Sequence, residues 1–297
     1  MPKNKKVERK RFAFASSTYA ESEFVVFGVP DDSGSAYRKG SRYAPDMIRS
    51  FVNKNEIGGV ITGSRFSMFG PGMKKFSSKV HDAGNLSRKE LGLVGKSIRN
   101  RKVSIGLGGD HSITADILRA AKPGHKWGIA YFDAHPDIVN SRGRYFGSVV
   151  NDISKLEGFD PEASALIGIR TPEEEEIDNI KKLGIEVVTP QDIEERGARA
   201  VAESLRHILT ADTYISIDMD VLDPAYAPGV TEPEPGGISS TQLIYLIDKI
   251  ASERTFGVDI TEVVPKFDKE GMTMHMAYRL ILYSISAIDT AKRRQSI

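Results

Sequence analysis

Three potential metal ligands stand two residues apart at Asp133, His135 and Asp137, directly after the apolar stretch 129–132. That stretch has the composition of a buried strand. In an extended backbone, side chains two residues apart point to the same face, so we expect the three to converge on one point. Carboxylates and imidazoles bind divalent first-row metals such as Mn²⁺, Fe²⁺ or Zn²⁺. A structural site built from thiolates is excluded, because the chain has no cysteine.

The same kind of arrangement occurs twice more in the chain. The β-branched and apolar stretch 214–217 leads into Asp218 and Asp220, which again share one face of an extended chain. The stretch 103–107 leads into His111 through paired glycines, which permit a tight turn. A single Asp or His after a strand is usually a turn residue or a helix cap. Three such sets, each at the end of a predicted strand, indicate a metal site instead.

Predicted strands and helices alternate along the whole chain. We expect strands at 24–29, 103–107, 129–132, 165–169, 185–188, 214–217 and 256–260. We expect helices from Pro45, at 89–100 and 113–121, from Pro172, and at 198–209, 240–251 and 272–286, with no prediction for 55–80. This alternation predicts an α/β fold, namely one three-layer α/β/α domain with a mostly parallel sheet.

Sheets of this kind bind their ligands outside the carboxyl ends of the strands. His111, the Asp133 set and the Asp218 pair all fall there, as does Glu262 after the last predicted strand. These sets hold more ligands than one Zn²⁺ normally takes, and a shared aspartate can bridge two ions. Two ions lower the pKa of a bridging water towards neutrality and present hydroxide to an electrophilic carbon. We therefore expect a hydrolase without an organic cofactor.

Composition narrows the class of protein further. The 297 residues can form one domain, and 41 Lys and Arg balance 40 Asp and Glu, which argues against nucleic acid or a membrane surface as a partner. No apolar run approaches the roughly 20 residues of a membrane span, and no leader precedes a cleavage site. We expect a cytoplasmic enzyme in which 1–22 form a basic, flexible, solvated arm and 23–297 a single catalytic domain.

Three motifs carry a resemblance to a known family. They are Gly108-Gly109-Asp110-His111-Ser112, Asp133-Ala134-His135-Pro136-Asp137 and Ser216-Ile217-Asp218-Met219-Asp220-Val221-Leu222-Asp223-Pro224. They resemble the signatures of the ureohydrolases, which include arginase and agmatinase. Further motifs are more similar to agmatinase than to arginase: Ala227-Pro228-Gly229, Glu234-Pro235-Gly236-Gly237, and Pro265 with Thr273. The resemblance covers most of the chain and implies an arginase-like fold, a homo-oligomer, and hydrolysis of a small cationic guanidino substrate, agmatine, to putrescine and urea.

The resemblance also implies two Mn²⁺ ions per subunit and a role for each residue of the site. One ion would be held by His111, Asp133, Asp137 and Asp218, and the other by Asp133, His135, Asp218 and Asp220. Asp133 and Asp218 would bridge the two ions. Asp137 would also hydrogen-bond the hydroxide, and Glu262 would bind the guanidinium of the substrate in a charge-assisted pair.

Two segments depart from the family pattern. In most relatives a loop histidine serves as a proton shuttle, whereas the matching segment here, 143–148, has no histidine. Relatives usually have Thr-Gly-Thr where this chain has Val230-Thr231-Glu232, which adds a carboxylate near the expected mouth of the site. Both departures bear on the substrate and on the rate.

Three glutamates, Glu173, Glu176 and Glu232, are expected near the far end of the substrate. Their charge predicts that an ammonium tail is attracted and a carboxylate tail repelled. The alternative is that they are merely solvated, with the first two stabilising a helix start. Two functional alternatives also stay open: hydrolysis of another guanidino or formimino compound, such as arginine or guanidinobutyrate, and a non-catalytic metal-binding regulator. The complete set of ligands favours an enzyme.

Overall fold

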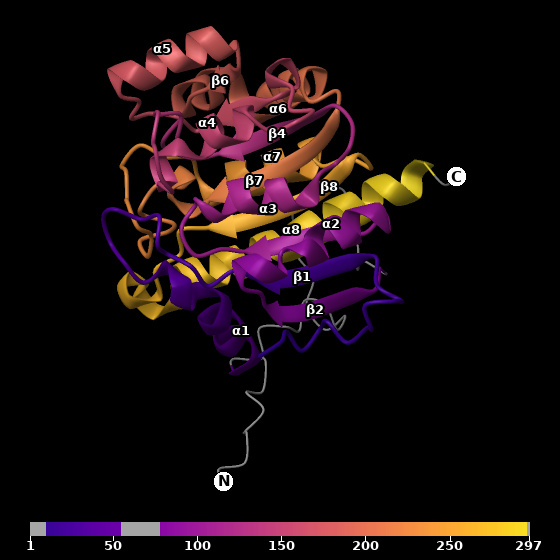
Figure 1. The fold of residues 1–297 in the computed structure, drawn as a ribbon. Helices are drawn as coiled ribbons and strands as arrows, with labels where there is room; N and C mark the ends of the chain where they lie inside the picture. The colour runs from indigo at the N-terminus through magenta and orange to yellow at the C-terminus, as the bar shows by residue number, and fades with distance from the viewer. Residues whose placement is uncertain (1–9, 55–77, 296–297) are drawn as a thin grey trace.

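An eight-stranded sheet forms the centre of the computed structural model, which describes residues 10–54 and 78–295 (Figure 1). The strands are β1 (Phe24–Gly28), β2 (Val80–Asn85), β3 (Val103–Leu107), β4 (Trp127–Phe132), β5 (Ala165–Ile167), β6 (Glu186–Val188), β7 (Asp212–Asp218) and β8 (Thr255–Thr261). They lie in the order β2-β1-β3-β8-β7-β4-β5-β6, and all neighbouring pairs are parallel. The predicted α/β fold is confirmed.

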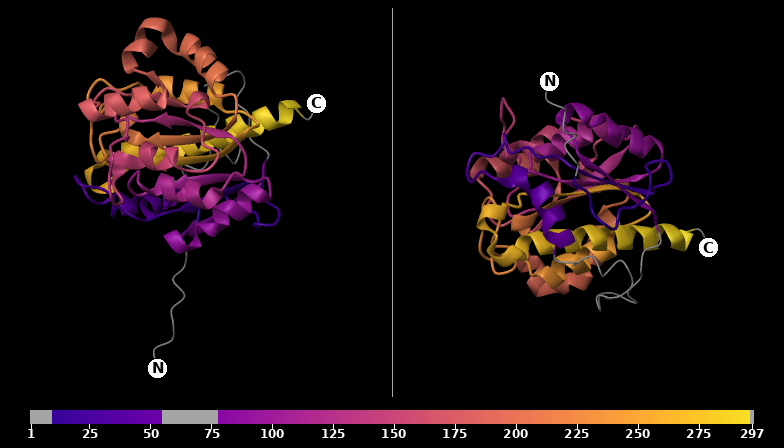
Figure 2. Two further views of the ribbon diagram at one scale, coloured as in Figure 1. Left: turned by 45° about the horizontal axis from the view of Figure 1, so that its top comes forward. Right: turned by 90° about the horizontal axis from the view of Figure 1, so that it is seen from below.

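Helices cover both faces of this sheet, so the domain has three layers (Figures 1 and 2). They are α1 (Ala44–Lys54), α2 (Gly92–Arg99), α3 (Ile113–Ala121), α4 (Val149–Ser154), α5 (Glu174–Leu183), α6 (Pro190–Ile208), α7 (Ser240–Ile250) and α8 (Met272–Gln295). None of the helices in the described ranges has the length and apolarity needed to cross a membrane.

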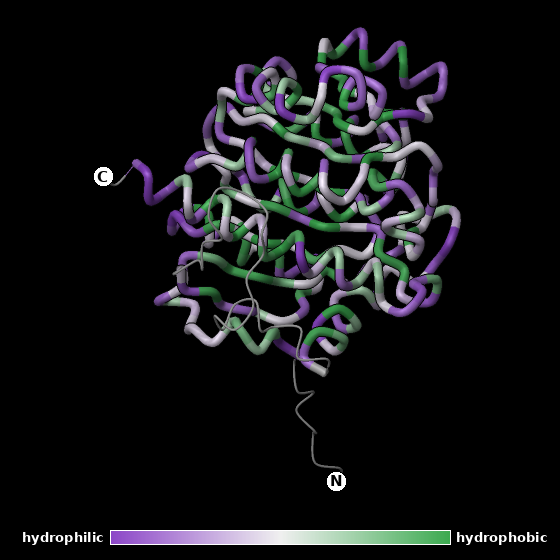
Figure 3. Tube along the Cα trace, turned by 180° about the vertical axis from the view of Figure 1, so that it is seen from behind, coloured by the Kyte–Doolittle hydropathy of each residue, from purple (hydrophilic) through white to green (hydrophobic). Residues whose placement is uncertain are grey.

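The core consists of two buried clusters, one on each face of the sheet. Val26 of β1 belongs with side chains of α1, α6, α7 and α8, whereas its neighbour Val25 belongs with side chains of α2, α3 and α4. Successive strand residues point to opposite faces, so strands covered on both sides must be apolar throughout. Figure 3 shows these apolar residues along the strands and the polar ones towards the outside.

Several elements differ from the expectation from sequence. The structure adds β2 and α4, begins α6 at Pro190, and continues α8 to Gln295. β2 lies at the edge of the sheet beside β1, and its other side is bridged at His81 by Ser16. Its sequence was not recognised as a strand because it contains polar residues, of which Asp82 is buried with a charged partner. The first part of α6 is interrupted by Gly197, whose φ of 78° is not helical.

Residues 10–22, which we expected to belong to the basic arm, lie against the domain. Phe12 is only 2% exposed, and its ring lies 5.1 Å from that of Phe14 and 5.8 Å from that of Tyr278 in α8. Burial of these rings attaches the segment to the core, so this part of the arm is not a solvated tail. Residues 1–9 lie outside the described residues.

A buried ion pair holds this segment, α1 and β2 together. Both carboxylate oxygens of Asp82 accept from Arg49, at 2.9 Å from Nε and 2.9 Å from Nη2. The backbone N–H of Phe12 also donates to Asp82, at 2.9 Å. The side chains of Arg49 and Asp82 are completely buried, so loss of one partner would leave the other charge uncompensated.

We predict that Arg49→Ala destabilises the protein by about 3–5 kcal/mol, because it leaves Asp82 buried without its partner. The matched control is Arg199→Ala, which removes an exposed helix pair with Glu203 and should cost well under about 1 kcal/mol. Urea unfolding of both variants measures the difference. Equal losses would contradict a special role for the buried pair.

Candidate metal centre

A polar side chain lies at the carboxyl end of each of the four central strands of the sheet. β3, β8, β7 and β4 are neighbours in that order, although they are far apart in sequence. His111 follows β3, Asp133 follows β4, Asp218 ends β7 and Glu262 follows β8. The parallel arrangement therefore brings the predicted site residues to one edge of the sheet.

His111 is the centre of a first group of potential ligands. Its Nδ1 lies 2.9 Å from Oδ2 of Asp133, 3.2 Å from Oδ2 of Asp218 and 3.5 Å from Oδ2 of Asp137. The imidazole is completely buried, and the three carboxylates are nearly so. Ligand atoms of His111, Asp133 and Asp137 lie within 4.8 Å of one another, a spacing that could accommodate a metal ion.

His135 is the centre of a second group. Its Nδ1 lies 3.4 Å from Oδ1 of Asp133 and 3.2 Å from Oδ2 of Asp220. Ligand atoms of these three residues also lie within 4.8 Å of one another. Asp133 thus presents one carboxylate oxygen to each imidazole and belongs to both groups.

The expectation that Asp133, His135 and Asp137 converge on one point is wrong. Asp137 lies with His111, whereas His135 lies with Asp220. β4 ends at Phe132, so the segment that follows is not an extended strand, and Asp137 has a left-handed φ of 50°. This conformation is unfavourable for a residue with a side chain, and such outliers cluster at functional sites.

The crowded aspartates of the two groups would be stabilised in their ionised form by a bound cation. Burial, and then the charge of neighbouring aspartates, raises the pKa of Asp137, Asp218 and Asp220. Burial also opposes ionisation of Asp133, but the two neighbouring imidazoles, His111 and His135, hold its pKa below the usual range. Asp133 Oδ2 is buried and accepts no hydrogen bond from the described residues. Carboxylates crowded in this way fit divalent ions, which compensate their charge.

Side chains that are not themselves potential ligands orient His111. Its Nε2 lies 2.8 Å from the hydroxyl of Ser216, which donates to Oδ1 of Asp259 at 2.6 Å. The buried Asp259 also accepts from Thr114 at 2.8 Å and from Tyr214 at 3.0 Å. These contacts fix the ring so that Nδ1 faces the carboxylates.

Tyr131 lies on the other side of the imidazole. Its ring stacks on His111 at 4.6 Å with an angle of 3° between the planes, and its hydroxyl donates to Oδ2 of Asp137 at 2.5 Å. The roles of Tyr131, Ser216 and Asp259 were not predicted from the sequence. A charged residue within the apolar stretch 256–260 was the one available signal, because such a residue is buried only with partners.

Glu262 is buried and already has two donors. Oε1 accepts from the backbone N–H of His111 at 2.6 Å, and Oε2 accepts from the hydroxyl of Thr231. Its φ of 63° is left-handed, and its own N–H donates to the carbonyl of Gly109 at 2.9 Å. Burial, and then the charge of Asp110, raises the pKa of Glu262 to about 8.

The three glutamates expected at the mouth occupy different environments. Glu232 is half-buried, with Oε2 at 3.8 Å from Nε2 of His135. Glu176 is buried and accepts from the N–H groups of Ile138, at 3.2 Å, and Glu173, at 3.0 Å. Glu173 is exposed and caps α5. Two of the three therefore also have a local role at the start of the helix.

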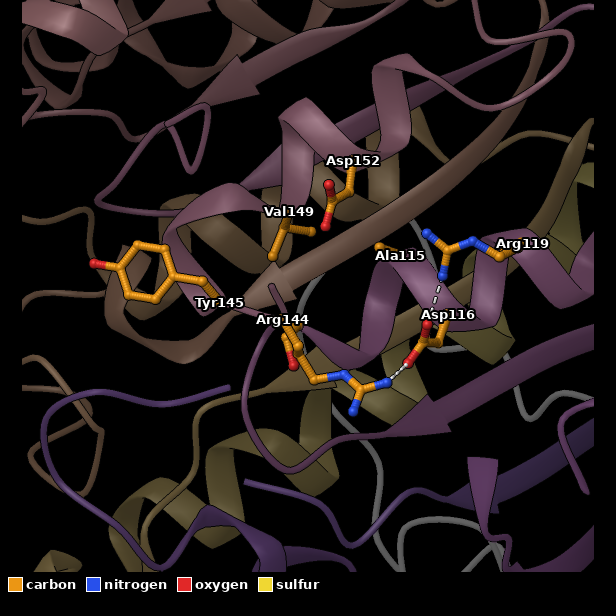
Figure 4. Close-up of a pocket in the computed structure, with 8 residues that line it drawn as sticks. Ala115, Asp116, Arg119, Arg144, Tyr145, Val149 and Asp152 are labelled. Carbon is orange, nitrogen blue, oxygen red and sulfur yellow. Dashed lines mark hydrogen bonds and ion pairs between the residues drawn. The ribbon is translucent and has the colours of Figure 1, made fainter. Parts of the chain in front are cut away.

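The loop without a histidine places Phe146, not a polar group, in a buried position against the ring of Tyr145 at 4.9 Å. A separate pocket of about 190 Å³ lies beside this loop and is lined by none of the six ligands (Figure 4). There Asp116 pairs with Arg119 at 2.5 Å and with Arg144 at 2.9 Å. The Tyr145 ring points away from these ion pairs (Figure 4).

Known proteins resemble the chain over nearly its whole length. Proclavaminate amidinohydrolase of Streptomyces clavuligerus is 32% identical over 272 residues, which cover 86% of this chain and 84% of that protein. Agmatinase of Cronobacter sakazakii is 30% identical over 292 residues, with 92% and 90% covered. The crystal structure of agmatine ureohydrolase of Thermoplasma volcanium superposes with a TM-score of 0.79 at 29% identity and covers 97% of both chains.

The family comparison agrees with the motifs and with the geometry of the site. The model of the Arginase family matches residues 22–286, a span that includes all six potential metal ligands and Glu262. The chain belongs to the arginase family.

Proposed function

We propose that the protein is a binuclear metal hydrolase of a guanidino compound, and that agmatine is its substrate, with putrescine and urea as products. The observation that carries the proposal is the pair of ligand groups that share Asp133, one around His111 and one around His135. Resemblance to agmatinases supports the substrate. Mn²⁺ as the metal is implied by the resemblance of the three motifs to those of the ureohydrolases.

The donor set suits the proposed ions. His111, Asp133, Asp137 and Asp218 would hold one, and Asp133, His135, Asp218 and Asp220 the other. When bound, such ions lower the pKa of water towards neutrality and so supply a nucleophile for the guanidinium carbon. Asp137 has one oxygen that accepts from Tyr131, which leaves the other available to accept a proton from that water.

Glu262 is proposed to bind the guanidinium. Both of its oxygens are held by protein donors, which fixes the carboxylate, yet each oxygen has a second lone pair for a guanidinium N–H. Burial makes ionised Glu262 costly when it is alone, so a cationic substrate would stabilise the ionised form. Glu232 and Glu173 would add a negative field for an ammonium tail.

A second candidate is hydrolysis of a different guanidino compound. It is favoured by the 32% identity to proclavaminate amidinohydrolase, which is similar to the identity with agmatinases. The metal groups act on the reacting carbon and place little restriction on the rest of the substrate. A panel of guanidino compounds assayed for urea release distinguishes the two candidates.

We predict that chelation abolishes urea release and that added Mn²⁺ restores it. Asp133→Ala should lose both ions, because its carboxylate contributes to both groups. Asp178→Ala, on the exposed face of α5, is the control and should keep both ions and full activity. Metal analysis alongside the urea assay tests this. Undiminished turnover by protein with no measurable metal would refute the mechanism.

Ser216→Ala should weaken binding of the ion at His111 by about 10-fold, since the partners of metal-bound histidines typically contribute that much. The control is Ser104→Ala, the same substitution at a buried serine of β3 whose hydroxyl has no partner among the described residues. Calorimetric titration with Mn²⁺ gives both affinities. An affinity equal to wild type in Ser216→Ala would show that Ser216 does not orient the ligand.

The charge at the mouth predicts a strong preference among substrates. Repulsion of a carboxylate tail can amount to several kcal/mol, so kcat/KM for agmatine should exceed that for arginine and 4-guanidinobutyrate by about 100-fold or more. The three compounds share the guanidinium and differ at the far end. Equal kcat/KM for arginine and agmatine would remove the glutamates from the explanation of specificity.

A further inference from the structure

The two ring nitrogens of His135 face different partners. Nδ1 faces Asp133 and Asp220, at 3.4 and 3.2 Å, whereas Nε2 faces Oε2 of Glu232 at 3.8 Å. A neutral imidazole that binds a metal through one nitrogen carries its proton on the other nitrogen. Glu232 therefore lies where the Nε2–H group of a metal-bound His135 requires an acceptor.

We propose that Glu232 is a positioning residue for the metal ligand His135. It accepts the hydrogen bond from Nε2–H, and so fixes the tautomer and the ring orientation in which Nδ1 is directed at the ion. This inference rests on the proposed metal pair, but not on the identity of the substrate. The separation of 3.8 Å exceeds a direct hydrogen bond. The proposed contact therefore requires a rotation of the Glu232 side chain, which is 29% exposed.

The loop that carries Glu232 is fixed relative to the site. Arg170 donates to the carbonyl oxygens of Glu234, at 2.7 Å, and Pro235, at 3.1 Å. The same guanidinium donates to the carbonyl of Asp220 at 2.6 Å, so it joins this loop to the ligand beside His135. Thr231, directly before Glu232, donates to Glu262. The backbone on either side of Glu232 is therefore fixed, by Thr231 before it and by Glu234 and Pro235 after it, and this places Glu232 beside the imidazole of His135.

In this arrangement the Nε2 atoms of His111 and His135, which point away from the proposed ions, face different kinds of groups. His111 contacts the hydroxyl of Ser216, which is backed by the buried Asp259. His135 lies nearer the solvent, at 21% exposed, and has a carboxylate as its neighbour. A carboxylate partner increases the basicity of a metal-bound imidazole and strengthens its bond to the ion.

The test is calorimetric titration of the metal-free protein with Mn²⁺, in the absence of substrate. Glu232→Gln should weaken the ion at His135 by about 10-fold and leave the ion at His111 unchanged. Glu232→Asp should recover part of the loss. The matched control is Glu234→Gln, which removes the same charge two residues away, on the same loop, and should bind both ions as wild type does.

A double-mutant cycle assigns the effect to His135. His135→Ala should retain one ion at most, and adding Glu232→Gln to it should cause no further loss of affinity. The inference is overturned if Glu232→Gln binds both ions like wild type, if Glu234→Gln weakens binding equally, or if the loss persists without His135.

Failure of the proposed function gives a different result. Wild-type protein that binds two ions but releases no urea from any guanidino compound would refute the proposed reaction and leave the role of Glu232 intact. Wild-type protein that takes up no ion at His135 would refute both.

Discussion

Four aspartates and two histidines are confined to one small, largely buried volume, and their mutual electrostatics constrain the rest of the structure. Burial and repulsion raise the pKa of Asp137, Asp218 and Asp220, so these side chains cannot all be ionised together without a compensating charge. Such a cluster costs stability unless it is rigidly positioned and occupied by cations. The sheet, the second layer of hydrogen bonds and the surrounding loops all contribute to that positioning.

Close backbone contacts complete the site. Gly109 lies so close to the loop after β1 that a Cβ atom there would lie 1.9 Å from the carbonyl oxygen of Asp31. Asp110 then accepts from the N–H groups of Gly34, at 2.6 Å, and Ser35, at 2.8 Å. Gly109 therefore permits the loop after β1 to lie against the candidate metal centre. The left-handed conformation of Glu262 is stabilised in the same region by its bond to Gly109.

The fold and the ligand set could be predicted from sequence because apolar strands and polar strand ends follow simple periodic rules. β3 and α3 were predicted within their observed limits, and the ends of four strands located the site. The division of the ligands was not predictable from strand periodicity, because Asp137 departs from the extended conformation. Ser216 and Asp259 were missed since hydrogen bonds between strands depend on register, which one sequence does not specify.

The two segments that depart from the family pattern differ in their contacts. In the first, Phe146 fills a buried position and its N–H donates to Gly34 at 3.3 Å, so the loop is attached to the protein without offering a proton donor there. In the second, Thr231 holds Glu262 while Glu232 approaches His135. One departure removes a titratable group, and the other adds a carboxylate beside a potential metal ligand. A more basic imidazole would make the ion that His135 holds a weaker Lewis acid, so the second departure would shift the pH range in which water is activated upwards. The first departure would act on a different step, because it leaves proton delivery to water or to another side chain.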